Sequence, residues 1–148
     1  MSPSFTAPIN SGILTFTDVS NDYLYAPAIK WAMKAGVIRG ITDKIFAPDK
    51  KITRLEMMVM LARFDEERGN ILALNEPERH LADCDKIPEW GRSAAHWAVA
   101  NGIIYGNNGN VLPDDNVKVK EAVAMISRLG KSIQKILQRL HLLPKKMV

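Results

Sequence analysis

The chain has 148 residues, 47% of them hydrophobic and 24% charged, which is the composition of a globular protein with one domain or two small ones. Its formal net charge of +4 comes from residues 131–148, which hold five bases and no acid, so the nearly neutral remainder gives no reason to expect nucleic-acid binding. No apolar run approaches the roughly 20 residues of a membrane helix, the first residues lack a signal-peptide pattern, and the single cysteine excludes an intrachain disulfide.

An internal repeat organises the chain. Trp31-Ala32 recurs as Trp97-Ala98, and the segment Gly-Val-Ile-Arg-Gly at 36–40 recurs as Gly-Ile-Ile-Tyr-Gly at 102–106. After a one-residue deletion the offset becomes 65, and it pairs Asp18 with Asp83, Pro48 with Pro113, Glu56 with Glu121, and Met60 with Met125. Two repeats of similar length follow, each expected to be one structural unit.

These repeats predict five segments. Residues 1–15 contain Pro and Ser and are expected to be extended. The first repeat is 16–66, a polar connector is 67–80, the second repeat is 81–130, and a basic tail is 131–148.

Within the first repeat we expect a helix, a turn and a second helix. Apolar residues at helical spacing form the first helix, and Gly36 is placed to end it in a left-handed cap. These residues are Leu24, Ala28, Ile29, Trp31, Ala32 and Ala35. Thr53 and Glu56 then predict a capping box at the start of the second helix, in which each side chain accepts a free backbone N–H. The buried face of this helix is expected to be Met57, Met60, Leu61 and Phe64.

The second repeat follows the same order with a weaker helix start. Its second helix is expected to bury Val123, Met125, Ile126 and Leu129. Lys118 replaces the capping threonine, which predicts loss of the cap at a cost of about 1 kcal/mol.

The tail after Gly130 forms an apolar stripe with cations opposite. Its members are Ile133, Ile136, Leu137 and Leu140. This pattern predicts a separate short amphipathic helix that packs back onto a monomeric chain. The expected fold is all-α: tandem helix-loop-helix repeats with an extra C-terminal amphipathic helix.

The motifs resemble the S-layer homology domain. In the first repeat they are Phe16-x-Asp18-Val19, Gly36-Val37-Ile38-x-Gly40, Phe46-x-Pro48 and Thr53-Arg54-x-Glu56; in the second they are Asp83, Trp90, Gly102-Ile103-Ile104-x-Gly106, Pro113 and Glu121. The resemblance implies pseudo-symmetric helical prongs, usually three, of which two are legible here. It also implies a secreted, non-catalytic module, without cofactor, that holds bacterial proteins at the cell surface by binding anionic, often pyruvylated, wall polysaccharide.

Departures from the family pattern predict unequal repeats. Leu24 stands where the family generally has tryptophan, and only the second repeat keeps one, Trp90. The Thr-Arg-Ala-Glu signature is Thr-Arg-Leu-Glu at 53–56 but Lys-Val-Lys-Glu at 118–121. We therefore expect the second repeat to bind weakly or differently.

Arg54 and Glu56 are the first candidate polysaccharide ligands. The planar guanidinium of Arg54 can hold a carboxylate beside the exposed N–H groups of a helix start. The alternative is a surface arginine that opposes the helix dipole slightly. We include Lys120, in the degenerate signature, and predict that Arg54→Ala weakens binding more than Lys120→Ala.

The remaining candidates each have a structural alternative. Gly40 and Gly106 could let a sugar approach the backbone, although a turn that needs positive φ is favoured. Trp90 could stack on a sugar or fill a core, and a core position is favoured for Trp31 and Trp97. Asp18 and Asp83 could accept sugar hydroxyls, although a carboxylate that binds its own backbone is favoured.

No catalytic or metal constellation is visible. His80 and His96 lie in different elements without a nucleophile nearby, the acids are scattered, and no cysteine or histidine spacing suits a metal. The rival to polysaccharide binding is a degenerate scaffold that serves protein interaction or assembly. A third possibility, attachment to nucleic acid or a membrane, rests on the charges of the tail alone, which could also contact another protein.

Overall fold

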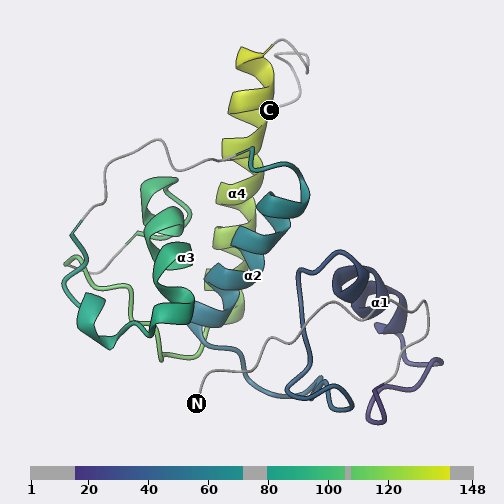
Figure 1. Cartoon of the computed structure of the whole chain (residues 1–148). Coiled ribbons are helices and arrows are strands. Elements are labelled where there is room, and N and C mark those ends of the chain that lie inside the picture. Colours follow the sequence, from purple (N-terminus) through teal and green to yellow (C-terminus); the bar gives the residue numbers. More distant parts are fainter. Residues whose placement is uncertain (1–15, 72–79, 106–107, 141–148) are drawn as a thin grey trace. The chain divides into compact units, whose positions relative to one another are not determined.

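The computed structural model describes residues 16–71, 80–105 and 108–140, and this part of the chain is all-α, as predicted (Figure 1). Its four α-helices are α1 (Ala26–Lys34), α2 (Arg54–Glu67), α3 (Glu89–Ala100) and α4 (Val119–Arg139), with a 3-10 turn at Cys84–Lys86. The described residues contain no strand, and their one isolated β-bridge joins Thr53 to Asn116. The expected extended segment 1–15, most of the connector and the end of the tail lie outside the described residues.

The chain divides into two compact units between Lys51 and Ile52. This boundary falls inside the first repeat, after α1 and before α2, rather than between the repeats. The C-terminal unit therefore combines the second helix of the first repeat with the whole second repeat. The reason is that α2 packs chiefly against α3 and, less extensively, against α4.

The N-terminal unit has a small core beside α1. Phe16, Val19, Ala26 and Ile29 are buried, and the rings of Phe16 and Phe46 lie 5.3 Å apart. Gly36 has a φ of 75°, so it ends the helix in the left-handed conformation that the sequence predicts.

Two large side chains that the sequence assigns to the apolar face of the first helix are exposed instead of buried. Trp31 is 54% exposed and Leu24, which precedes the helix, is 79% exposed. The prediction that Trp31 lies in the core is therefore wrong. Successive helical residues turn by about 100°, so Trp31 faces away from Ile29, the residue that α1 turns toward the small core.

The C-terminal unit holds the larger core. Its buried residues come from α2, α3, α4, the segment before α3 and the loop between the last two helices, and include Leu55, Met58, Ile87, Ala95, Trp97, Ala98, Ile103, Val111, Met125 and Leu129. Gly91 is required where α3 crosses the start of α2, because a Cβ there would overlap the side chain of Leu55. Trp97 is buried as predicted, at 6% exposure.

The two long helices begin with different caps. In α2 the predicted capping box is present: Thr53 Oγ1 accepts the N–H of Glu56 at 3.1 Å, and Glu56 Oε1 accepts the N–H of Thr53 at 3.0 Å. In α4, Glu121 Oε2 likewise accepts the N–H of Lys118 at 2.8 Å, but an ammonium group cannot accept a hydrogen bond in return. Helix α4 therefore lacks only one of the two capping hydrogen bonds, the one that a threonine hydroxyl accepts in α2.

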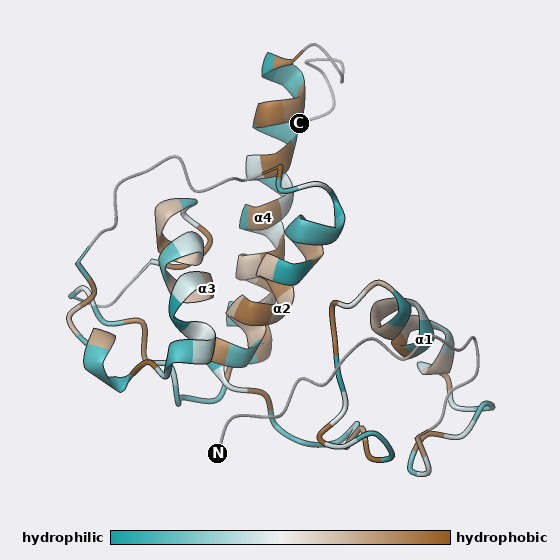
Figure 2. Cartoon of the chain, in the orientation of Figure 1, coloured by the Kyte–Doolittle hydropathy of each residue, from teal (hydrophilic) through white to brown (hydrophobic). Residues whose placement is uncertain are grey.

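Helix α4 continues through Gly130 as a single 21-residue element, so the prediction of a separate tail helix is wrong. Glycine costs about 1 kcal/mol inside a helix, and Ile133 and Ile136 offset this cost by packing on the same core as Leu129. Figure 2 shows the alternating hydrophobic and hydrophilic segments of this amphipathic helix.

The face of α4 that the sequence predicts to be buried is partly exposed. Val123 and Ile126 are 60% and 54% exposed, whereas Met125 and Leu129 are buried. The predicted face is therefore only half right, because the core stripe passes through 125, 129, 133 and 136. None of the described helices is both long enough and apolar enough to cross a membrane.

Candidate functional site

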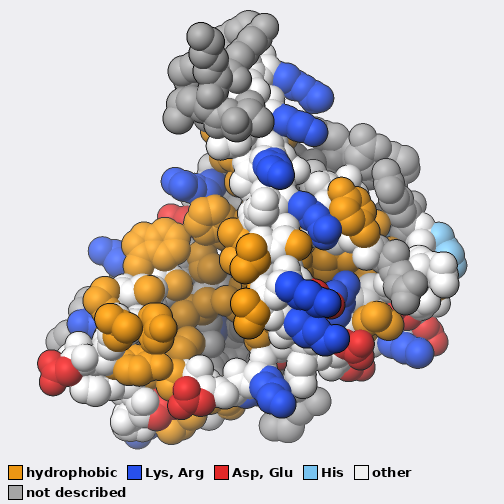
Figure 3. Space-filling view, turned by 180° about the vertical axis from the view of Figure 1, so that it is seen from behind, with side chains coloured by type: hydrophobic (Ala, Val, Ile, Leu, Met, Phe, Trp, Pro, Cys, Tyr) orange, Lys and Arg blue, Asp and Glu red, His pale blue; other side chains and the backbone are white. Residues whose placement is uncertain are grey.

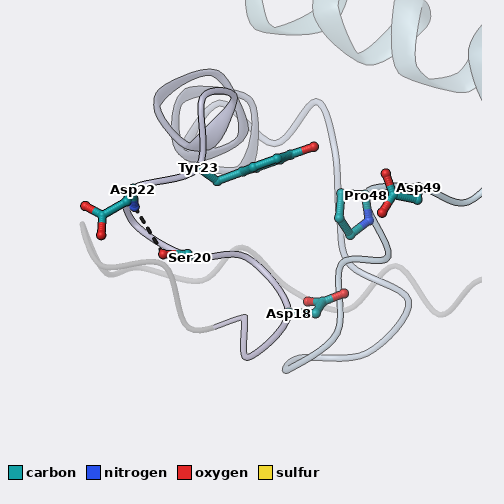
Figure 4. A pocket seen from close by; sticks show the side chains of 6 residues that line it. All are labelled: Asp18, Ser20, Asp22, Tyr23, Pro48 and Asp49. Carbon is teal, nitrogen blue, oxygen red and sulfur yellow. Dashed lines mark hydrogen bonds between the residues drawn. The ribbon is translucent and has the colours of Figure 1, made fainter.

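The candidate site is a pocket of about 400 Å³ in the N-terminal unit. It lies between the approach to α1 and the loop that follows this helix. Its lining residues are Asp18, Ser20, Asp22, Tyr23, Pro48 and Asp49. In Figure 4 the Tyr23 side chain reaches toward Pro48, Asp18 lies on the other side of the pocket, and the Asp22 carboxylate points away from the others.

Asp18 builds the wall of this pocket. Its two carboxylate oxygens accept the backbone N–H groups of Phe46 at 3.0 Å and Ala47 at 2.7 Å. The hydrogen bond from Phe46 is the main cause that holds the pKa of Asp18 below its ordinary value. Asp18 therefore stays ionised and fastens the loop that carries Pro48 and Asp49.

The remaining polar groups of the pocket are more open. Ser20 Oγ accepts the N–H of Asp22 at 3.2 Å, which shapes the turn before α1. Asp22 and Asp49 are exposed, and Tyr23 is half-buried against the small core of the unit. The pocket thus offers carboxylate oxygens, a hydroxyl and one aromatic ring.

The second repeat reproduces the Asp18 arrangement at Asp83. Asp83 is 3% exposed, and its carboxylate accepts the N–H groups of Val111 at 3.0 Å and Leu112 at 2.9 Å. Leu112 has a φ of 54°, close to the 59° of Ala47 at the equivalent position. The geometry favours the structural alternative for both aspartates, and sugar binding by either stays a prediction.

Some lining residues of the pocket differ in the second repeat. At the offset of 65, Asp22 and Tyr23 become Ile87 and Pro88, and Ile87 is buried at 1% exposure. The second repeat thus keeps the carboxylate that fastens the loop and loses the aromatic ring, while Asp85, at the position of Ser20, replaces the acid that is lost at Ile87. Weaker or different binding by the second repeat stays a prediction.

Arg54 lies at a junction between the two repeats. Its Nε donates to the carbonyl oxygen of Val111 at 2.9 Å, and its Nη1 lies 3.4 Å from Glu121 Oε1. Since Val111 also donates its N–H to Asp83, the two candidate residues Arg54 and Asp83 converge on one loop residue. The guanidinium is largely buried, with 12% of the side chain exposed.

The helix start beside Arg54 is not open to an anion. The N–H of Arg54 donates to Asp115 O at 2.8 Å and the N–H of Leu55 donates to Pro113 O at 3.1 Å. The prediction that these N–H groups are exposed is therefore wrong, because carbonyl oxygens of the second repeat accept their hydrogen bonds.

The candidate Glu56 and its counterpart Glu121 both serve helix starts. Glu56 closes the capping box of α2 and Glu121 performs its half of the cap on α4. The hydrogen bond from the Lys118 N–H, and then the charge of Arg54, hold the pKa of Glu121 below its ordinary value.

The other candidates lie in mixed surroundings. Gly40 has no positive φ; glycine is required there because a Cβ would overlap Thr42 O and the Phe16 ring, so the predicted positive φ is wrong. Trp90 is half-buried and packs against the larger core. Lys120 is exposed, and Gly106 lies outside the described residues.

Sequence reasoning missed most of the pocket. Asp22 and Tyr23 precede α1 without a counterpart in the second repeat, so the internal comparison passed over them. The signal that could have found them was the cluster of acids and an aromatic residue on either side of one helix. Among the described residues, no group of three or more histidine, cysteine or acidic side chains could hold a metal ion.

Comparison with known proteins identifies the repeats. The family model of the S-layer homology domain matches residues 15–58 and 81–128. The relatives include the cellulosome-anchoring protein of Acetivibrio thermocellus, 32% identical over 80% of this chain, and the surface-layer 125 kDa protein of Lysinibacillus sphaericus, 32% identical over 67%. An endoglucanase of Bacillus sp. (strain KSM-635) is 31% identical over 84%. The aligned regions span 26%, 8% and 14% of these relatives, and no solved structure matches.

Proposed function

Because the chain belongs to the S-layer homology domain family, a family of cell-surface anchoring modules, we propose that it binds the anionic, pyruvylated polysaccharide of a bacterial cell wall. One relative is named for anchoring and another for the surface layer, which supports attachment at the bacterial cell surface. The endoglucanase is covered over only 14% of its length, so its enzymatic name carries no argument for catalysis in this chain.

The pocket in the N-terminal unit is the observation that carries the proposal. Carboxylate oxygens accept hydrogen bonds from sugar hydroxyls, and an aromatic ring can pack against the apolar face of a pyranose. Asp49 supplies a carboxylate from the loop after α1, Tyr23 supplies a ring from the segment before α1, and Asp18 holds the loop that carries Asp49. Such a combination of a few polar groups with an apolar wall is typical of a small-molecule site.

The charge of the pocket limits what it can recognise. Asp18, Asp22 and Asp49 give it three acids, and like charges at short range repel. The pocket therefore suits the hydroxyls of the polysaccharide, while its anionic substituents require cations elsewhere on the chain.

Wall sedimentation with a matched pair of variants tests the proposal. Asp49 and Asp114 are exposed and occupy equivalent loop positions, but only Asp49 lines the described pocket. We expect Asp49→Ala to weaken binding to walls by about tenfold, the effect of losing one charged hydrogen bond, and Asp114→Ala to leave it unchanged. If the unaltered protein sedimented with walls stripped of their polysaccharide as well as with intact walls, this result would contradict the proposal.

The second candidate function is assembly through protein contacts. Exposed apolar side chains favour it: Val119, Val123 and Ile126 on α4 are 82%, 60% and 54% exposed, and Trp31 on α1 is 54% exposed. Light scattering separates the candidates, because assembly predicts a concentration-dependent mass without polysaccharide.

A further inference from the structure

Helix α4 carries a row of cations along its solvent side. The members are Lys120, Arg128, Lys131, Lys135 and Arg139, and the last four are spaced by three or four residues, which places them on one face. Figure 3 shows Lys and Arg side chains following this helix. From Lys120 to Arg139 the row is about 28 Å long at 1.5 Å per residue.

Arg128 is engaged, because its guanidinium donates to Ile103 O at 3.3 Å and lies over the Tyr105 ring, whereas Lys131, Lys135 and Arg139 have no acid beside them on α4. The one acid of α4, Glu121, is engaged by Arg54 and by the N–H of Lys118. Within the described part of the chain, none of Lys131, Lys135 and Arg139 forms an ion pair. A solvent-exposed helix face usually mixes both signs, so this face departs from the ordinary pattern.

The stability of the helix does not account for the row. Lys131, Lys135 and Arg139 follow one another at four-residue intervals, where like charges destabilise a helix. The helix dipole favours a cation in the last turn, which accounts for Arg139 but not for Lys131. The row is thus an unfavourable feature of the isolated chain that an anionic ligand would relieve.

We propose that this row binds the anionic substituents of the wall polysaccharide, as a second contact besides the pocket of the N-terminal unit. The inference rests on the proposed function and supplies the cations that the acidic pocket lacks. Lysine ammonium groups are point charges on flexible stems, so they suit carboxylates spaced along a polymer without demanding one fixed geometry. Arg54, whose guanidinium holds Val111 and Glu121, is not needed for this contact.

The test compares two double variants of the full chain. Lys131→Glu with Lys135→Glu reverses two charges of the row, and Lys30→Glu with Lys34→Glu makes the same change at the same spacing on α1. Binding to purified pyruvylated polysaccharide is measured at about 0.1 M and about 1 M salt, where the screening length falls from about 10 Å to about 3 Å. We expect the α4 variant to bind at least about fivefold more weakly at low salt, with little further loss at high salt. The α1 variant should behave like the unaltered protein.

Further arms separate the possible failures. Removal of the pyruvate from the polysaccharide should lower binding of the unaltered protein to the level of the α4 variant. Equal binding by both double variants would overturn the role of the row while leaving the proposed function intact, whereas no binding by the unaltered protein would overturn both. Tighter binding to anionic vesicles or duplex DNA at the same salt would overturn the assignment to polysaccharide. Circular dichroism checks that each variant remains helical.

Discussion

Arg54→Ala is expected to lower the stability of the C-terminal unit, because Arg54 joins the two repeats there. The substitution removes the Nε donor from the carbonyl of Val111, a residue with 0% exposure, and a buried acceptor left without its partner costs about 1–3 kcal/mol. The partly exposed ion pair to Glu121 adds less than about 1 kcal/mol. Together these losses predict a destabilisation of about 2–3 kcal/mol.

Thermal and urea unfolding measure this effect. In a unit of this size each kcal/mol lowers Tm by about 4–8 °C, so a fall of roughly 10 °C or more is expected. Lys120→Ala is the matched control: Lys120 is exposed and forms no hydrogen bond or ion pair with the described residues, so its loss should change stability by less than about 0.5 kcal/mol. Arg54→Lys should be more stable than Arg54→Ala but less stable than the unaltered protein, because one ammonium group cannot reach both partners of the guanidinium.

Two results would refute this reasoning. The first is an Arg54→Ala protein as stable as the Lys120→Ala protein. The second is a stable Arg54→Ala protein that no longer binds polysaccharide, which would make Arg54 a direct ligand.

Three further predictions concern a buried methionine, two glycines and the carboxylate of Asp18. Met58→Ala should cost about 2–5 kcal/mol in chemical denaturation because Met58 is fully buried, whereas Val123→Ala, at the equivalent position of α4 but 60% exposed, should cost under about 0.5 kcal/mol. Gly40→Ala should destabilise the N-terminal unit because its Cβ would overlap the backbone, whereas Gly130→Ala should raise stability by about 1 kcal/mol, both measured by Tm. Since the folded pKa of Asp18 lies below 3.8, its stabilisation is complete above that pH and disappears as the pH falls through the lowered pKa; Asp18→Asn should remove this dependence in an acid titration followed by circular dichroism.

The sequence was sufficient for features that depend on local chemistry. The capping box of Thr53 and Glu56 and the left-handed Gly36 were predicted because each needs only its neighbours along the chain. The repeat comparison also paired Asp18 with Asp83, whose carboxylates hold equivalent loops.

Features that depend on which helix packs against which were not predictable in this way. Helical spacing finds an apolar face, but it does not say that α2 joins the second repeat or that α1 leaves Trp31 exposed. The N–H groups at the start of α2 looked free because their carbonyl partners, Pro113 and Asp115, lie some sixty residues away in the sequence. The pocket was missed for a related reason, since its two sides are separated by α1.

The position of Arg54 gives a physical reason for the degenerate signature of the second repeat. Arg54 stands at the start of one long helix and holds the loop of the following repeat, through Val111. Val119, at the equivalent position of α4, is 82% exposed, so no loop of the described chain covers it. An arginine there would have no carbonyl to hold, and its cation at a helix start would oppose the helix dipole. In the described chain the complete signature thus stands where Arg54 holds the loop of the other repeat, and the stability of Arg54→Ala measures that interaction.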